Sequence, residues 1–170
     1  MIRKHFIGVL LVPLILHAAC GPPSEEEKIR RFIHRAADLV EKGDVDAVMD
    51  LFAPDYTDFE GRDKEAAGLL IADYLRNRRG VVIRPLGMVI EGFDPDGRAR
   101  VRTEVMLSSG SAEALRRLVP LAGETYRFDL ILGRTAGNTW LIRFAEWEHR
   151  PAGDLMPESL EVLKKLFSAK

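Results

Sequence analysis

The spacing of apolar residues predicts three helices in the N-terminal half of the chain. The first, residues 24–42, has apolar residues every three or four positions and opens on a serine and a glutamate spaced as a capping box. Gly43 ends it, and Asp44 is expected to cap a shorter second helix that Pro54 closes. Asp63 is expected to cap the third helix, which finishes at the basic sequence RNRRG.

Apolar residues then recur at every second position, which predicts four strands: residues 81–91, 99–108, 125–134 and 139–148. In the second of these, one face is apolar and the other charged, as in an antiparallel sheet covered on one side. The sequence DPDG predicts a hairpin turn before it, and SGSAEALRRLVPLAGE after it predicts a loop with one or two helical turns. The polar sequence DYTDFEG is expected to form a rim strand or a turn.

Helices followed by strands are the order of an α+β domain rather than of an alternating fold. We expect three N-terminal helices packed on a curved antiparallel sheet of four main strands, within residues 25–150. Residues 151–170 are expected to form a C-terminal amphipathic helix. No repeat or low-complexity tract interrupts this plan.

The chain begins with two basic residues, an apolar run and small residues before its only cysteine, Cys20. This is the pattern of a secretory signal, too short for a membrane-spanning helix. It resembles the signal peptides of bacterial lipoproteins in Ala18 and Ala19 before the cysteine, although His17 stands where a leucine is usual. The alternative is ordinary cleavage near Ala18 or Ala19, which leaves a free thiol.

The resemblance implies that residues 1–19 are removed and that Cys20 is acylated, with residues 20–24 as a short tether to the lipid bilayer. Gly21 after the cysteine favours the outer membrane, facing the periplasm. Without residues 1–19 the chain has 23 basic and 26 acidic residues and no basic block, so nucleic acid is not expected as a partner.

Two segments of the chain resemble the nuclear transport factor 2-like superfamily, whose conical, cystatin-like fold is shared with ketosteroid isomerases and polyketide cyclases. LVEKGDVDAVMDLFAPDYTDFEGRDKEA is similar to the helix, Gly-Asp break, second helix, rim strand and third-helix entry of that superfamily, and NTWLIRFAEWE to its last strand. The resemblance covers about residues 25–148. It implies a cone in which the concave sheet face and the helices enclose a pocket.

Candidate catalytic groups are few. His34 is expected on the water side of the first helix and His149 at the rim, so the sequence predicts no metal site and no cofactor. Asp58 and Glu146 are the carboxylates that a general base in an apolar cup would use. The simpler interpretation is that Asp58 caps the turn before Gly61 and that Glu146 pairs with a strand neighbour such as Arg84 or Arg127.

If strict alternation holds along the last strand, Glu146 shares its face with Trp140, Ile142 and Phe144. The predicted concavity then includes the ligand-pocket candidates Tyr56, Thr103, Tyr126, Trp140 and Phe144.

Two functions remain open at this point. The first is a non-enzymatic domain that binds a small apolar ligand or an envelope protein. The second is a ketosteroid-isomerase-like isomerase or lyase that uses a pocket carboxylate as general base. A monomer or weak dimer is expected, because the charged outer face of the sheet would make a poor apolar seam.

Overall fold

The computed structural model describes residues 22–78, 80–109 and 123–168. The predicted signal peptide, Cys20 and most of the long segment between the middle strands lie outside these residues. The helices are α1 (Glu25–Lys42), α2 (Val45–Met49), α3 (Lys64–Asn77) and α4 (Pro157–Ser168), with a 3-10 turn, η2 (Ala152–Asp154). The strands are β1 (Phe52–Asp58), β2 (Val82–Phe93), β3 (Ala99–Ser108), β4 (Glu124–Arg134) and β5 (Trp140–His149).

The predicted helix caps are confirmed. The side chain of Ser24 accepts the N–H of Glu27 at the start of α1, and Gly43 ends that helix with φ 71°. Asp44 and Asp63 cap α2 and α3 in the same way, each accepting a backbone N–H three residues on. These side chains satisfy N–H groups that have no partner within their helix, so local sequence sets where each helix begins.

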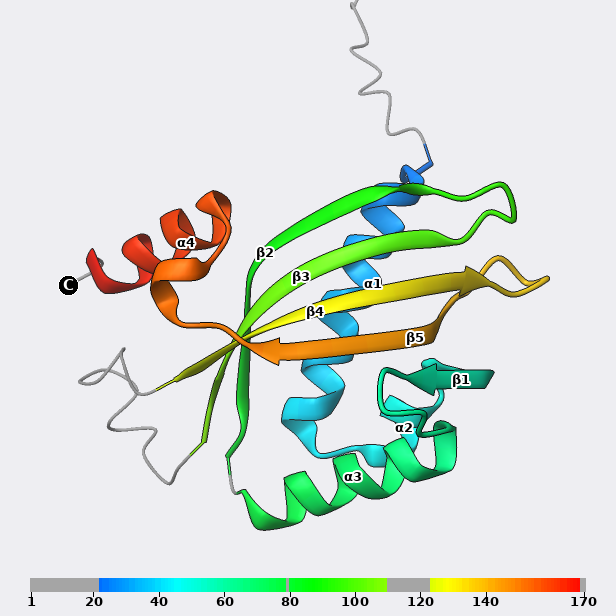
Figure 1. Cartoon of the computed structure of the whole chain (residues 1–170), viewed down its shortest axis with the longest axis horizontal. Helices are drawn as coiled ribbons and strands as arrows, with labels where there is room; N and C mark the ends of the chain where they lie inside the picture. The colour runs from blue at the N-terminus through cyan, green and yellow to red at the C-terminus, as the bar shows by residue number, and fades with distance from the viewer. Residues whose placement is uncertain (1–21, 79, 110–122, 169–170) are drawn as a thin grey trace, which may run out of the picture.

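The sheet has five strands in the order β1-β5-β4-β3-β2, as Figure 1 shows. Four of them pair antiparallel as predicted, but β1 is a full fifth strand that pairs parallel with β5. Pro54 does not close α2, which already ends at Met49, but lies within β1. A proline is tolerated there because β1 is an edge strand, where one side of the backbone has no ladder to complete.

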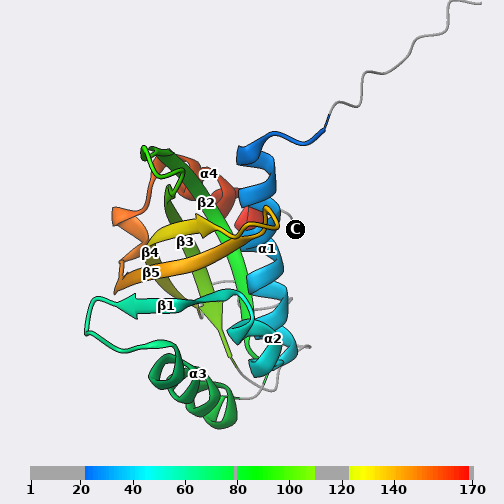
Figure 2. The same ribbon diagram turned by 90° about the vertical axis from the view of Figure 1, so that its right-hand side faces the viewer.

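One face of the sheet, called here the inner face, packs against α1, and the main hydrophobic core lies between them (Figures 1 and 2). Ile29, Phe32 and Ile33 of α1 are buried against Val101 and Leu132 of the strands. The shorter helices α2 and α3 pack against each other, and α3 also packs against β1. The hydrophobic stripe predicted for the first helix therefore faces the sheet as expected.

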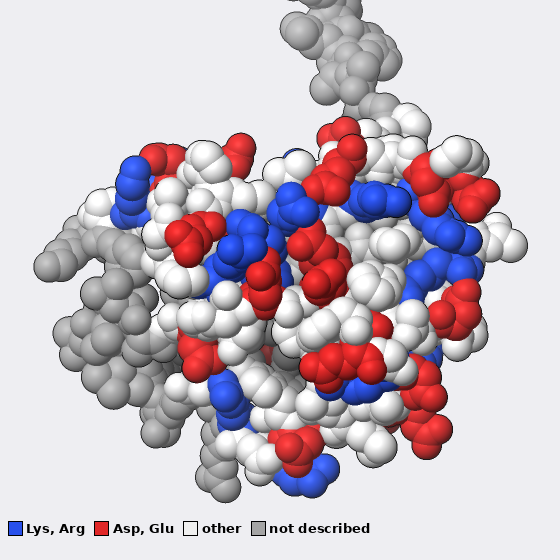
Figure 3. Space-filling view, viewed as in Figure 1, with Lys and Arg blue, Asp and Glu red and all other residues white. Residues whose placement is uncertain are grey.

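The outer face carries a second, smaller core under α4. Leu86 and Met106 are buried there against Leu155 and the apolar side of α4. Gly87 lets the helix approach closely, because a Cβ at this position would clash with Ser159 Oγ. The rest of the face shows acidic and basic side chains side by side (Figure 3). Arg102 of β3, for example, pairs with Glu91 and Asp129.

Candidate functional site

A bulge in β5 decides which side chains face the core. Leu132 of β4 is opposite Ile142, yet the preceding residue, Ile131, is opposite Phe144, so Arg143 is an extra residue in the strand. An extra residue reverses the alternation beyond it. The strand therefore turns Ala145 inward in the second half, together with Trp147 and His149.

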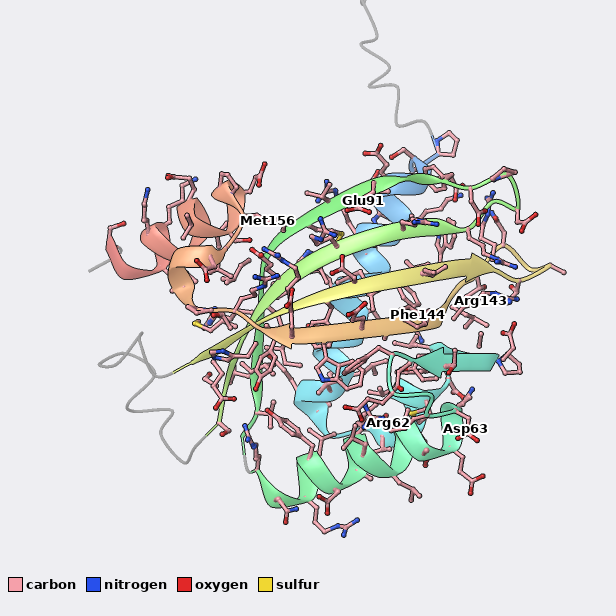
Figure 4. All side chains as sticks on the ribbon, in the orientation of Figure 1. Arg62, Asp63, Glu91, Arg143, Phe144 and Met156 are labelled. Atoms are coloured by element: carbon pink, nitrogen blue, oxygen red, sulfur yellow. The ribbon has the colours of Figure 1, made fainter. Side chains whose placement is uncertain are left out.

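The bulge corrects the predicted face. Trp140 and Ile142 face the core as expected, but Phe144 and Glu146 lie on the outer face, where Glu146 is opposite Asp129 and exposed. Figure 4 shows Phe144 and Arg143 side by side near β1. Neither Phe144 nor Glu146 lies in the predicted concavity.

Asp58 lies at the end of β1 with a completely buried side chain. Its Oδ1 accepts the backbone N–H groups of Glu60 and Arg62, both at 2.9 Å, and its Oδ2 accepts Nε of Arg62 at 2.6 Å. The backbone N–H of Gly61, with φ 79°, completes the turn by donating to the Asp58 carbonyl. This confirms the simpler interpretation for Asp58, which caps the turn before Gly61. The pairing expected for Glu146 is wrong: among the described residues it has no ion pair with Arg84 or Arg127, and Arg127 pairs with Glu104 instead.

The electrostatics of this turn favour an ionised carboxylate. Burial would raise the pKa of Asp58, but the hydrogen bonds from the Arg62 side chain and from the two backbone N–H groups hold the pKa below its ordinary value. Burial, followed by the negative charge of Asp58, raises the pKa of Tyr56 to about 12. Tyr56 is therefore a neutral phenol at physiological pH.

A group of aromatic side chains surrounds the exposed side of this ion pair. Phe59 packs edge-on against Trp147, with ring centroids 4.9 Å apart. The ring centroid of Phe128 lies 6.3 Å from that of the same indole. The guanidinium carbon of Arg62 lies 5.2 Å from the Trp147 ring centroid, within cation–π range. We call Phe59, Arg62, Phe128 and Trp147 the aromatic rim. It combines partly exposed aromatic rings with one cation.

A second polar group joins the end of α3 to the start of β4. Arg78 donates to the hydroxyl of Tyr74 at 3.0 Å and lies 3.7 Å from Glu124. The hydroxyl of Tyr126 donates to Glu124 at 2.9 Å, and its ring packs edge-on against His149. Burial and the hydrogen bond to Glu124 raise the pKa of Tyr126.

The remaining pocket candidates contribute to the core. Tyr56 packs edge-on against Phe52, and Trp140 is buried in the main core. Thr103 is buried too, and its hydroxyl donates to the carbonyl of Gly87 at 3.1 Å. Of the five predicted pocket residues, only Tyr126 lies on the inner face with a partly exposed side chain.

Neither a metal site nor a membrane span is found among the described residues. Within residues 22–78, 80–109 and 123–168, no three or more histidine, cysteine or acidic side chains gather in a way that could hold a metal ion. His34 is exposed on α1, as predicted. In the same part of the chain, no helix is both long and apolar enough to cross a membrane.

Comparison with solved structures identifies the fold. A nuclear transport factor 2-like protein of unknown function from Pseudomonas aeruginosa superposes with a TM-score of 0.60 over 73% of this chain and 99% of that chain, at 21% identity. The chain has the nuclear transport factor 2-like fold. No family model matches the sequence, and no curated protein matches it either.

Other structures with this nuclear transport factor 2-like architecture differ in their described roles. One is a protein of unknown function with a cystatin-like fold from Nostoc punctiforme, with TM-score 0.59 and 18% identity over 75% of this chain and 94% of that chain. Another is a putative scytalone dehydratase from Novosphingobium aromaticivorans, with TM-score 0.61 and 13% identity over 75% of this chain and 85% of that chain. At these identities the likeness shows the fold alone, so function must be argued from the site.

Sequence reasoning missed most of the aromatic rim. Strict alternation along the last strand puts Trp147 on the face opposite Glu146, away from the predicted concavity, and no sequence pattern singled out Phe59 or Arg62. One signal was available: Gly133 lies within β4 beside the bulge, and a glycine inside a strand pattern often marks such an irregularity. In the structure the Arg143 side chain folds over Gly133, where a Cβ would collide with it.

Proposed function

We propose that this nuclear transport factor 2-like domain binds a small apolar or aromatic ligand without transforming it, on a protein held at the membrane by an acylated Cys20. The observation that carries the binding proposal is the state of Asp58. Both of its oxygens are occupied by donors, and its lowered pKa keeps it ionised.

A general base must reach a substrate proton and have a pKa near the working pH. Asp58 meets neither condition, because its side chain has no exposed surface and Arg62 stabilises its charged form. Glu146 lies on the outer face, opposite the face that carries Phe128 and Trp147. The isomerase or lyase alternative therefore lacks support from the two carboxylates that motivated it.

The aromatic rim supplies what a binding site needs. Partly exposed rings offer large contact area with little conformational entropy to lose. Arg62 is paired with Asp58 and Glu60. Its guanidinium lies within cation–π range of Phe59 and Trp147. The ion pair with Asp58 holds the arginine in place before a ligand arrives. The favoured ligand is a flat apolar or aromatic molecule.

The experiment uses anilinonaphthalene sulfonate, a flat aromatic anion, as the probe. Its fluorescence should rise on binding to the whole chain, and Trp147→Ala should weaken binding about tenfold, the effect of losing a central aromatic contact. Phe93→Ala is the matched control, because Phe93 is also an exposed aromatic residue but lies at the far end of β2, beside Trp140. Equal losses in the two variants would refute a specific site at the rim.

Anchoring is tested separately. Labelled palmitate should enter the wild-type protein, and Cys20→Ser should abolish labelling and release the protein from the envelope or leave its signal uncleaved. Fractionation should place the wild type in the outer membrane, facing the periplasm. A protein that takes up no fatty acid would refute the anchor while leaving the binding proposal intact.

A further inference from the structure

A hollow of about 640 Å³ opens between α2 and α3, and none of its lining residues belongs to the aromatic rim. Its walls come from the two helices and from Pro54 of β1, and its apolar lining includes Val45, Met49 and Leu69. The Met49 side chain of α2 lies beside Gly68 of α3, where even a Cβ would make only ordinary contact with it. The hollow has the volume of a ligand pocket but lies open on the surface.

Leu69 is the unusual residue of this surface. Its side chain is 69% exposed, more than any other large hydrophobic residue that the structure describes as exposed. Leu70, the next residue, is 43% exposed but does not line the hollow. A leucine that stays in water beside an apolar hollow gives up the free energy that burial would provide, which is characteristic of interaction surfaces.

The rim of the hollow is acidic. Asp46 lies on its α2 side, and Asp63 and Glu65 lie on its α3 side (Figure 4 labels Asp63). The one basic residue of the lining, Lys64, has its ammonium group directed to the carbonyl of Phe52 at 2.8 Å. Three carboxylates therefore surround an apolar floor. The one basic side chain of the lining is hydrogen-bonded to a backbone carbonyl.

We propose that this hollow is a docking site for a segment of another protein that presents an apolar side chain flanked by lysines or arginines. The apolar side chain would pack on Met49 and Leu69, and the basic residues would face Asp46 and Glu65. An apolar centre with a charged rim is the usual anatomy of a peptide-binding groove, and an amphipathic basic helix is the simplest segment that matches it. The acidic rim disfavours an anionic membrane surface as the occupant.

The test compares two short labelled peptides, one of leucine and lysine and one of leucine and glutamate, by fluorescence anisotropy with the whole chain. The leucine–lysine peptide should bind more tightly, and added salt should weaken it because exposed charges are screened. Leu69→Ser should weaken its binding about tenfold, as expected for the central contact of an interface. Charge reversal by Asp46→Lys with Glu65→Lys should weaken it at least as much.

Leu70→Ser is the matched control, since it removes an exposed leucine from the same helix at a position outside the hollow. It should leave binding of the leucine–lysine peptide within about twofold, the range of residues outside an interface centre. Equal binding of both peptides, or equal losses in the two leucine variants, would overturn the proposal. So would a loss of binding to phosphatidylglycerol vesicles in Leu69→Ser without any loss of peptide binding.

Discussion

The carboxylate of Glu104 and the guanidinium of Arg127 form a two-bond ion pair across β3 and β4, with Oε1 accepting from Nε at 3.0 Å and from Nη2 at 2.7 Å. The other oxygen of Glu104 accepts the backbone N–H of Met156 at 2.7 Å, just before α4 (Met156 is labelled in Figure 4). Arg127 also donates to the carbonyl of Asp154. One buried carboxylate on the sheet therefore holds the segment that leads into the last helix.

Removing this carboxylate should be costly. Glu104→Ala leaves the charge of Arg127 and the N–H of Met156 without their acceptor, in a pair whose side chains are 0% and 17% exposed. We expect a loss of about 3 to 5 kcal/mol in the free energy of unfolding, measured by urea denaturation. Asp129→Ala removes a partner of Arg102 on the same face, from a pair far more exposed than that of Glu104, and should cost about 1 kcal/mol or less. Similar losses in both variants would contradict this role of Glu104.

The ion pair of Asp58 predicts a pH dependence. Its pKa in the folded protein lies below the unfolded value of about 3.9, so the stabilisation is fully present above about pH 4 and is lost as pH falls through the folded pKa. Asp58→Asn should lower stability near neutral pH and flatten the fall in stability on acidification. Urea unfolding at several pH values between about 2 and 6 measures the slope. An unchanged slope in the variant would show that Asp58 is not a source of the acid sensitivity.

Much of this architecture could be predicted from sequence because it rests on local signals. The serine and aspartate caps and Gly43 act within a few residues, and the alternation in β3 is unbroken, so helix starts and the sheet face of β3 were predicted correctly. The prediction for the last strand is wrong after Arg143, because this extra residue puts Phe144 and Glu146 on the opposite face. A bulge depends on pairing with a distant strand, so the sequence of β5 alone does not contain it.

The same reasoning explains β1 and the aromatic rim. The sequence DYTDFEG predicted a rim strand or a turn, and the structure has an edge strand that ends at Asp58 and a turn after it. The parallel pairing with β5 and the buried Asp58–Arg62 contact were not predicted. Arg62 becomes a candidate ligand-binding residue only because the fold brings Trp147 beneath it, 85 positions later in the chain. Local patterns cannot reveal such a contact, which exists only in the assembled tertiary structure.

Two glycines should respond in opposite ways to alanine. A Cβ at Gly68 would make ordinary contact with the Met49 side chain at 3.5 Å, so Gly68→Ala should stabilise α3 by roughly 0.5 to 1 kcal/mol through its higher helix propensity. A Cβ at Gly87 would clash with Ser159 Oγ and lie 3.3 Å from the backbone nitrogen of Ser159. Gly87→Ala should therefore destabilise the protein by about 1 to 3 kcal/mol. Thermal and urea unfolding of both variants give the comparison.

A double-mutant cycle isolates the cause of the Gly87 effect. The hydroxyl of Ser159 is buried and has no hydrogen-bond partner among the described residues, so Ser159→Ala alone should be neutral or slightly stabilising. Combined with Gly87→Ala, it should recover part of the lost stability because the clashing oxygen is gone. Strictly additive effects would mean that the close approach of α4 at this point does not limit the substitution.

The last helix is expected to control self-association. Leu86 and Met106 are buried on the outer face because α4 covers them. The neighbouring surface carries ion pairs, and removing them from water in a dimer interface would cost free energy. With α4 in place we expect a monomer or weak dimer by light scattering. Leu163→Asp places a charge in this contact and should release the helix, so that the exposed apolar patch makes the measured mass rise with concentration.

Lys164→Asp is the control for that experiment, because it introduces the same residue at the adjacent, exposed position of α4. It should leave the mass of the wild type unchanged, since its side chain does not enter the contact with Leu86. Circular dichroism should show that Leu163→Asp retains its strands, which separates the release of one helix from general unfolding. If the released form stays monomeric at every concentration, α4 acts only as a brace for the sheet; if the wild type already forms a stable dimer, its seam lies elsewhere on the molecule.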